Sequence, residues 1–332
     1  MKTKHLLAKS LLALSIAASA RAQLTFVDLN PAGSTYSAAD ATTGTQQAGY
    51  ARIGGVISAG IWSGTTASFV NLNPVGSTYS YATATTGAQQ AGYADIGGIF
   101  NAGIWSGTAG SFVNLNPTGS SSSEALATTG TQQAGFALLG EVESAGIWSG
   151  TAASFVNLNP SGSTASTADA TTGTQQAGFA QIGGVVSAGI WSGTAASFVN
   201  LNPTGSTGST AFATTGTQQA GLAIIGGVYN AGIWSGTAAS FVELQSVLGS
   251  GYSDSGANGI WDDGTTTYVS GYADTTGGQQ DAILWMIPDA APAPEPASAA
   301  LLGLGTLLLA ARRRRGAQGV FPRVGAKPPT LG

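Results

Sequence analysis

The sequence predicts an all-β repeat fold, and three observations lead to this prediction. Phenylalanine recurs every 43 residues, at Phe26, Phe69, Phe112, Phe155, Phe198 and Phe241. Tryptophan recurs with the same spacing, at Trp62, Trp105, Trp148, Trp191 and Trp234. Turn signals divide each copy into short β-type runs, and no copy has the periodicity of a helix.

Within one copy, four turn signals separate four expected strands. In the second copy these signals are Asn73-Pro74, Thr86-Gly87, Gly97-Gly98 and Ser106-Gly107. Four short strands in a repeat of roughly 40 to 45 residues is the pattern of a β-propeller blade. A β-solenoid with about two rungs per copy is the alternative.

The side chains predict the order of the four strands. A run of small residues (80–85) suits a crowded innermost strand, and the run that contains the Gln pair comes next. The third strand (58–62) ends in Ile61 and Trp62, which point to opposite faces although both are large and apolar. We therefore expect this strand to be covered on both faces, with residues 69–72 as the outermost strand.

Counting the inner strands predicts six blades. They are expected to begin near Ser37, Ser80, Ser123, Ser166, Ser209 and Ser255. The last copy has expected strands at 257–261, 268–273 and 281–287 and then meets Pro288 without an outer strand. Because residues 26–29 resemble an outer strand with no copy before it, we expect this N-terminal strand to close the sixth blade. The predicted six-bladed β-propeller thus covers residues 23–287.

Residues 1–22 have the pattern of a secretory signal peptide. Lys2, Lys4 and Lys9 accompany an apolar run at 11–18, which is followed by Ala20-Arg21-Ala22. The run is shorter than the roughly 20 residues that span a bilayer. We expect signal peptidase to cleave after Ala22, with a buried N-terminal helix as the alternative.

The C-terminal region predicts a second targeting segment. Residues 288–296 form a Pro-rich linker, and proline removes the N–H groups that a sheet or helix would use. Residues 297–315 combine a single hydrophobic helix with a run of arginines that is expected to stay in the cytoplasm, so the body of the protein lies outside the inner membrane. The apolar stretch (297–311) is short for a stable span and suits a transient membrane anchor. Residues 316–332 are expected to be a disordered tail.

The C-terminal motifs resemble a known sorting signal. Pro294, Glu295 and Pro296 precede the hydrophobic helix, which precedes Arg312, Arg313, Arg314 and Arg315. This order is similar to the PEP-CTERM signal of Gram-negative bacteria and covers about 22 residues. The resemblance implies that an exosortase-type membrane protease cuts near the motif and passes the protein to the cell surface or extracellular matrix. The tail at 316–332 departs from the family, whose signals usually end soon after the arginines.

The repeat itself resembles, more loosely, the extracellular repeat family named HAF for a His-Ala-Phe tripeptide. The resemblance rests on the AGIWSGTAASFVNLNP pattern and on residues 281–285, and it implies a propeller-like fold. Ser-Ala-Gly or Asn-Ala-Gly stands where the tripeptide would lie. No His-based role is therefore carried over to this chain.

Composition restricts the chemistry that the mature chain can perform. The single histidine, His5, lies in the predicted signal peptide, and the sequence has no cysteine. Catalysis by Ser/His/Asp or Cys/His, zinc sites of the usual type and disulfides are thereby excluded. Residues 23–293 carry Arg52 as their one base against 14 acids, a net charge of −13, so nucleic acid is not an expected partner.

Two repeated features are candidate binding residues. The periodic Trp residues could offer platforms for sugar rings, but their place in the most apolar strand favours a core role. A Gln pair follows each Thr-Gly turn and could line a polar ring for sugar hydroxyls. Identical copies share identical structural needs, so hydrogen bonds to the neighbouring turn are the favoured interpretation. The pairs are Gln46-Gln47, Gln89-Gln90, Gln132-Gln133, Gln175-Gln176 and Gln218-Gln219.

The last copy is different because acids gather in it. They are Asp254, Asp262, Asp263, Asp274 and Asp281. The segment from Asp254 faintly resembles a calcium loop, but Thr265 stands at the twelfth position, which excludes an EF-hand. A weak Ca²⁺ site centred on Asp254, Asp262 and Asp263 and an acidic sugar-binding pocket are two interpretations. Solvated turn residues are the third and favoured one, and a glycosidase would have to use Asp262 or Asp263.

Taken together, these features predict a secreted, non-enzymatic protein with a structural or adhesive role at the cell surface or in the extracellular polymeric matrix. Extracellular polysaccharide is the expected surrounding partner. The alternative is a carbohydrate-binding lectin, or a weak glycosidase or lyase, with its site on the sixth copy.

Overall fold

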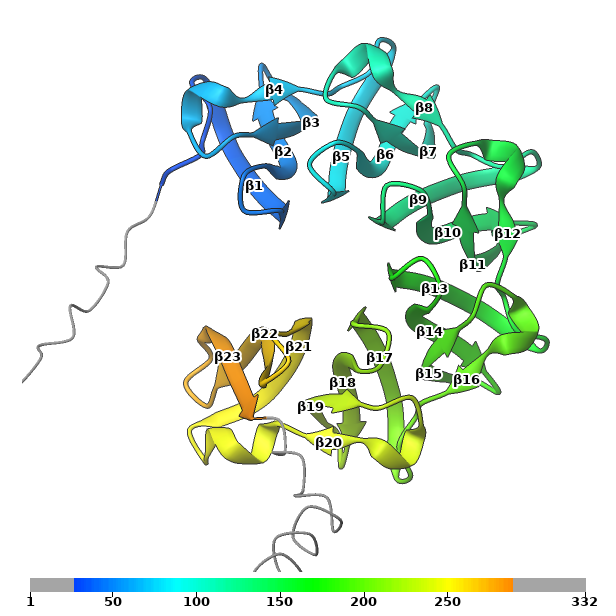
Figure 1. Ribbon diagram of the computed structural model, residues 1–332, viewed down its shortest axis with the longest axis vertical. Coiled ribbons are helices and arrows are strands. Elements are labelled where there is room, and N and C mark those ends of the chain that lie inside the picture. Colours follow the sequence, from blue (N-terminus) through cyan, green and yellow to red (C-terminus); the bar gives the residue numbers. More distant parts are fainter. Residues whose placement is uncertain (1–26, 289–332) are drawn as a thin grey trace, which may run out of the picture. The chain divides into compact units, whose positions relative to one another are not determined.

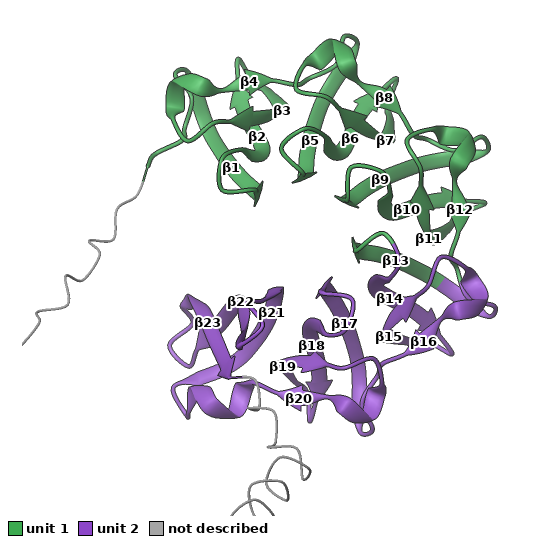
Figure 2. Ribbon diagram, viewed as in Figure 1, with its two compact units in different colours: residues 1–159, 165–173 green, residues 160–164, 174–332 purple. Residues whose placement is uncertain are grey.

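A computed structural model describes residues 27–288, in which the regular elements are antiparallel strands and a few short 3₁₀ turns (Figure 1). Contacts divide the chain into two compact units (Figure 2). Unit 1 holds residues 1–159 with 165–173, and unit 2 holds residues 160–164 with 174–332.

Unit 1 contains three four-stranded sheets in which consecutive strands are neighbours. Sheet 1 has β1 (Ser34–Thr42), β2 (Gln47–Ile53), β3 (Val56–Trp62) and β4 (Val70–Asn71). Sheet 2 has β5 (Ser77–Thr85), β6 (Gln90–Ile96), β7 (Ile99–Trp105) and β8 (Val113–Asn114). Sheet 3 has β9 (Ser120–Thr128), β10 (Gln133–Leu139), β11 (Val142–Trp148) and β12 (Val156–Asn157). One short 3₁₀ turn precedes each outer strand, namely η1 (Thr66–Ser68), η2 (Ala109–Ser111) and η3 (Ala152–Ser154).

The boundary between the units passes through β13 (Ser163–Thr171). Sheet 4 has the order β13-β14-β15-β16 and continues with β14 (Gln176–Ile182), β15 (Val185–Trp191), η4 (Ala195–Ser197) and β16 (Val199–Asn200). Sheet 5 has β17 (Ser206–Thr214), β18 (Gln219–Ile225), β19 (Val228–Trp234), η5 (Ala238–Ser240) and β20 (Val242–Glu243). Sheet 6 follows η6 (Gln245–Leu248) and has β21 (Tyr252–Asp262), β22 (Thr266–Thr275) and β23 (Gln280–Pro288).

The predicted all-β fold of repeated four-stranded sheets is confirmed, and the turn signals explain the strand ends. Gly97 and Gly98 join β6 to β7 with φ angles of 67° and 78°. Two consecutive residues with positive φ are what the tightest hairpin turns require, and glycine adopts them without strain. Pairing is antiparallel within every sheet with four strands per full copy, as in blades and unlike the rungs of a solenoid.

The hydrophobic core lies between neighbouring sheets of a unit. In unit 1, Trp105 of β7 packs against Ala59 and Ile61 of β3, with Leu72 and Ala82 in the same cluster. The same arrangement recurs one copy later, where Trp148 of β11 packs against Ile104 of β7. Strand β7 is buried on both faces over its last five residues, as the sequence predicted for this strand.

The outer strand is shorter than expected because its phenylalanine packs elsewhere. The ring of Phe112 lies over Gly103 of β7, where any Cβ would overlap the ring. The ring also lies 5.0 Å from that of Trp105. Only Val113 and Asn114 then pair with β7, as β8.

Sheet 6 has three strands among the described residues, and the N-terminal segment does not complete it. Residues 27–29 form no strand, and Phe26 lies outside the described residues. Ile283 of β23 stands opposite Gly271, whereas sheet 2 has Gly103 opposite Gly92. The described residues therefore show no fourth strand on sheet 6, and the predicted closure by residues 26–29 is not seen among them.

Candidate functional site

The two predicted targeting segments lie outside the described residues. This holds for the cleavage position after Ala22, for Pro294-Glu295-Pro296, for the hydrophobic helix and for the four arginines. Within residues 27–288, none of the short helical turns has the length and hydrophobicity to cross a membrane.

The periodic tryptophans are core residues and not exposed platforms. Trp105, Trp148, Trp191 and Trp234 have no exposed surface, and Trp62 is 1% exposed. Their indole rings therefore offer no face to a ligand.

The Gln pairs join successive copies through partly buried hydrogen bonds. The Nε2 of Gln90 donates to Oε1 of Gln46 in the preceding copy at 2.8 Å. The same Oε1 accepts a hydrogen bond from the hydroxyl of Thr85 at 2.6 Å. On its other side, Oε1 of Gln90 accepts the backbone N–H of Gly107 at 3.0 Å, so Gln90 bonds a turn as the sequence favoured and bridges to the previous copy as well.

The structure separates the three aspartates of the predicted calcium site. Asp254 lies near one end of β21 and accepts the backbone N–H of Tyr229. Asp262 and Asp263 lie eight residues further along, about 26 Å in an extended strand. No group of three or more acidic, His or Cys side chains able to hold a metal ion occurs between residues 27 and 288.

Asp262 and Asp263 shape the turn between β21 and β22. Oδ1 of Asp262 accepts the N–H of Gly264, and Oδ1 of Asp263 accepts the N–H groups of Thr265 and Thr266. Hydrogen bonds from Thr265, first from its hydroxyl, lower the pKa of Asp263. These contacts fit the turn role that the sequence favoured.

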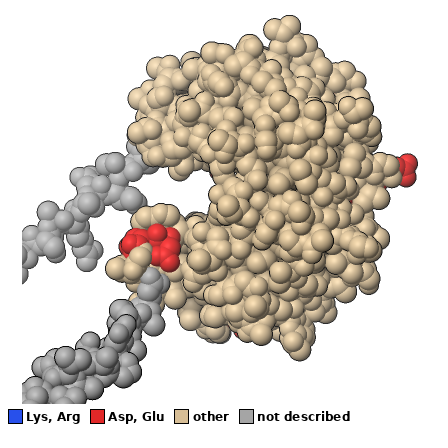
Figure 3. Space-filling model, turned by 45° about the vertical axis from the view of Figure 1, so that its right-hand side comes forward, with Lys and Arg blue, Asp and Glu red and all other residues tan. Residues whose placement is uncertain are grey.

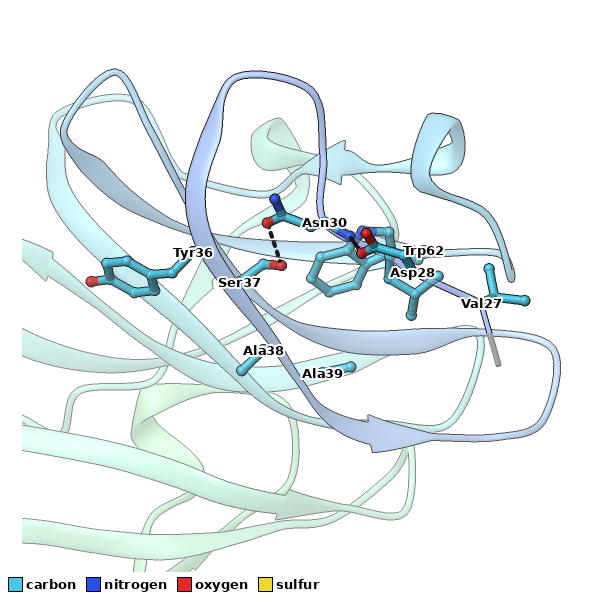
Figure 4. Close-up of a pocket in the computed structure, with 9 residues that line it drawn as sticks. Val27, Asp28, Asn30, Tyr36, Ser37, Ala38, Ala39 and Trp62 are labelled. Carbon is cyan, nitrogen blue, oxygen red and sulfur yellow. Dashed lines mark hydrogen bonds between the residues drawn. The ribbon is translucent and has the colours of Figure 1, made fainter. Parts of the chain in front are cut away.

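A pocket of about 440 Å³ lies on sheet 1. Figure 4 shows its lining, in which Trp62, Ser37 and Ala39 face the N-terminal segment with Asp28 and Asn30. The corresponding face of sheet 2 is covered by sheet 1, because Ala82 and Trp105 pack on Ile61. The pocket therefore lies on the face of sheet 1 that corresponds to the face of sheet 2 covered by the preceding copy. It is not a site with chemistry of its own.

A position-by-position comparison of the copies shows where they differ. Most strand positions are the same or similar in all five full copies, but six positions change in size and charge. In the first copy they are Tyr36, Ala38, Asp40, Tyr50, Arg52 and Ile57, and in the second copy Tyr79, Tyr81, Thr83, Tyr93, Asp95 and Phe100. We call them the divergent positions. These differences are visible in the sequence alone, although the predictions above rest on what the copies share.

The divergent positions are cross-strand neighbours within each sheet. In sheet 2, Tyr79 pairs with Asp95, which pairs with Phe100, and Tyr81 pairs with Tyr93. Side chains at paired positions share one face of a sheet. Variation between copies is thus gathered on one part of one face.

In sheets 1 and 2 this part is aromatic. The rings of Tyr81 and Tyr93 stack with centroids 5.1 Å apart. Tyr79 contacts Phe100 at 5.3 Å, and Tyr50 of sheet 1 reaches Tyr81 at 4.7 Å. We call Tyr36, Tyr50, Tyr79, Tyr81, Tyr93 and Phe100 the aromatic face.

In the next two copies three of the divergent positions carry carboxyl groups, namely Glu124, Glu143 and Asp169. Burial, followed by the charge of Glu143, raises the pKa of Glu124 to about 7. The same two causes raise the pKa of Asp169 to about 7. The hydroxyl of Thr167 donates to Glu143. Most of the face shown in Figure 3 is uncharged, and its acidic residues lie mainly in one patch.

Comparisons with known proteins add little to this geometry. No protein-family model matches the sequence, and no curated protein matches it. Among solved structures, the chain is similar to TolB from Acinetobacter baumannii, with 13% identity and a TM-score of 0.46. The match covers 62% of this chain and 53% of the TolB chain, so the chain spans about half the length of that protein. Nothing about function follows from so distant a likeness.

Proposed function

We propose that this chain is an exported, non-enzymatic repeat protein with a structural or adhesive role at the cell surface or in the extracellular matrix. Its sheets are the blades of a β-propeller in this proposal. The observation that carries it is the use of the repeated side chains. Trp105, Gln90 and Ser80 of a single copy each contact the copy before it.

The sorting part of the proposal rests on Pro294-Glu295-Pro296 and on Arg312 to Arg315. We expect a host with an exosortase-type protease to release a protein that lacks everything from about residue 297 onward. Mass spectrometry of matrix-associated protein measures the new C-terminus. A variant with the four arginines replaced by serine is expected to stay unprocessed, and peptides containing Arg323 or Lys327 from the matrix would contradict the proposal.

Asp263 does not fit the role of the general acid of a glycosidase on sheet 6. Such an acid needs a raised pKa, whereas the pKa of Asp263 is lowered. The calcium hypothesis narrows to Asp262 and Asp263, since Asp254 lies at the other end of β21.

Thermal unfolding in calcium tests this narrowed hypothesis. If the dissociation constant is about 1 mM, 10 mM Ca²⁺ stabilises the folded state by roughly 1.4 kcal/mol. We expect Asp262→Asn/Asp263→Asn to lose the increase in melting midpoint and Asp254→Asn to keep it. An equal response of the parent and the double variant would leave the aspartates as turn residues only.

A further inference from the structure

The divergent positions are not dictated by the packing that repeats. Residues that fill the core between sheets, such as Ala59, Ile61 and Trp105, recur in every full copy, and sheets 2 and 3 each use them to pack on the copy before. By contrast, one divergent position holds Ala38, Tyr81 and Glu124 in the first three copies, so it has no packing requirement common to all copies. The side chains at the divergent positions are therefore open to a role that differs from copy to copy.

The aromatic face concentrates five of the nine tyrosines of the chain on two adjacent sheets. Tyr36 at its edge is 41% exposed, and the other rings are half-buried. Rings held against one another, as Tyr79 is against Phe100, lose little further freedom when a ligand stacks on them. The face is thus a preformed apolar surface with polar hydroxyls.

The hydroxyls of these five tyrosines bond to none of residues 27–288. Elsewhere tyrosine hydroxyls do find partners, since Tyr252 donates to Asp281 and Tyr268 donates to Asp263. Asp95, paired across the strands with Tyr79, accepts a hydrogen bond from Thr78 through Oδ2. Its Oδ1 is buried and receives no hydrogen bond from the described chain. Donor and acceptor capacity therefore remains beside the rings.

The charged residues around the aromatic face determine whether a charged or an uncharged sugar can bind there. Arg52, over the ring of Tyr36, is the only base in residues 23–293. The neighbouring carboxyls of Asp40, Asp95 and Glu124 act on the same tyrosines and raise their pKa values after burial does so. An acidic polysaccharide would be repelled here, whereas an uncharged sugar ring would not.

We propose that the aromatic face, Tyr36 and Tyr50 with Tyr79, Tyr81, Tyr93 and Phe100, binds a neutral oligosaccharide. Sugar C–H faces stack on the rings, and sugar hydroxyls bond to the free phenol groups. The inference deepens the adhesive part of the proposed function by naming a ligand class and its site. It does not depend on how the chain is exported.

Calorimetric titration of the full chain tests the proposal with four separate probes: cellohexaose, laminarihexaose, maltohexaose and the anionic hexagalacturonate. We expect at least one neutral hexasaccharide to bind at millimolar concentration or below and hexagalacturonate to bind at least roughly tenfold more weakly. No binding of any neutral probe, or preference for hexagalacturonate, would overturn the proposal. Correct sorting of a chain that binds none of them would leave the export proposal standing by itself.

Variants at the rim of the face locate the site. Tyr36→Ala/Tyr79→Ala is expected to weaken binding roughly tenfold through lost stacking, and Tyr36→Phe/Tyr79→Phe only about threefold because the rings remain. Tyr229→Ala is the matched control, since Tyr229 is 46% exposed and occupies the divergent position of Phe100 in the fifth copy. Melting midpoints check that each variant folds. Parent-like binding by a folded Tyr36→Ala/Tyr79→Ala would move the ligand elsewhere and refute the site, and so would an equal loss in Tyr229→Ala.

Discussion

Sheets 1 and 2 place the same side chains in different surroundings. Ala82 of sheet 2 has no exposed surface because sheet 1 covers it, whereas its counterpart Ala39 is exposed and lines a pocket. Ser80 accepts the backbone N–H of Ala59 in sheet 1, while no described strand precedes sheet 1 to donate to Ser37 in this way. Burial in this protein is therefore a property of the joint between copies and not of a copy alone.

The largest difference between the two sheets is expected when Ala82 and Ala39 are each replaced by arginine. Ala82→Arg forces a guanidinium between Ile61 and Trp105, so we expect a loss of more than about 4 kcal/mol in the free energy of unfolding. Ala39→Arg should change it by less than about 0.5 kcal/mol, as a surface substitution does. Denaturant unfolding measures both. Similar losses in the two variants would mean that sheet 1 is covered as sheet 2 is.

A smaller effect is expected from the paired serines. Ser80 donates to Asn73 at 2.6 Å and accepts the N–H of Ala59 at 2.9 Å, so Ser80→Ala leaves a buried donor without its partner. We expect a loss of about 1 to 3 kcal/mol. Ser37→Ala, which breaks only the bond to Asn30, should cost less than about 1 kcal/mol. Hydrogen exchange of the Ala59 amide reports the first change directly, and unchanged protection would argue against the bond.

A pH dependence is expected from Glu124 of sheet 3, whose counterpart in sheet 1 is Ala38. The pKa of Glu124 is about 7 when folded, above its ordinary value of 4.5. The folded state then binds more protons between these values, so stability falls as pH rises from about 4.5 to 7 and is level above that. Melting midpoints of the parent and of Glu124→Gln/Asp169→Asn should converge at low pH and separate towards pH 7, with the parent lower. Parallel curves would contradict this.

The sequence predicted the features that repeat and missed those that depend on neighbours. The Gly97-Gly98 turn and the two-sided burial of the strand ending at Trp105 follow from local patterns. The length of the outer strand did not, because only the contact between Phe112 and Gly103 takes the phenylalanine out of the strand. The alignment of residues 281–285 with the repeat already places Ile283 at the position of Gly103, and the strand register agrees with it.

The sequence shows the aromatic residues of the divergent positions, but it does not show that they form one face. The inner strand has an irregularity between Ala82 and Ala84, which breaks simple alternation of side chains along it. The contact between Tyr50 and Tyr81 joins residues of different sheets, whose approach no strand pattern encodes. The predicted calcium site combined Asp262 and Asp263, which are neighbours at one end of β21, with Asp254. Asp254 lies near the other end of this extended strand.

The bridge from Gln46 to Gln90 and on to the N–H of Gly107 has a genetic consequence. Each joint uses one glutamine from the copy before it and one from its own copy, and the same bonds recur between Gln89, Gln133 and Gly150. Recombination that inserts or deletes any multiple of 43 codons between two such joints rebuilds an identical joint at the scar. Alleles of this gene that differ by whole copies should therefore encode chains with intact junctions, whereas a deletion that removes only one glutamine of a joint would leave the amide of the other without its partner.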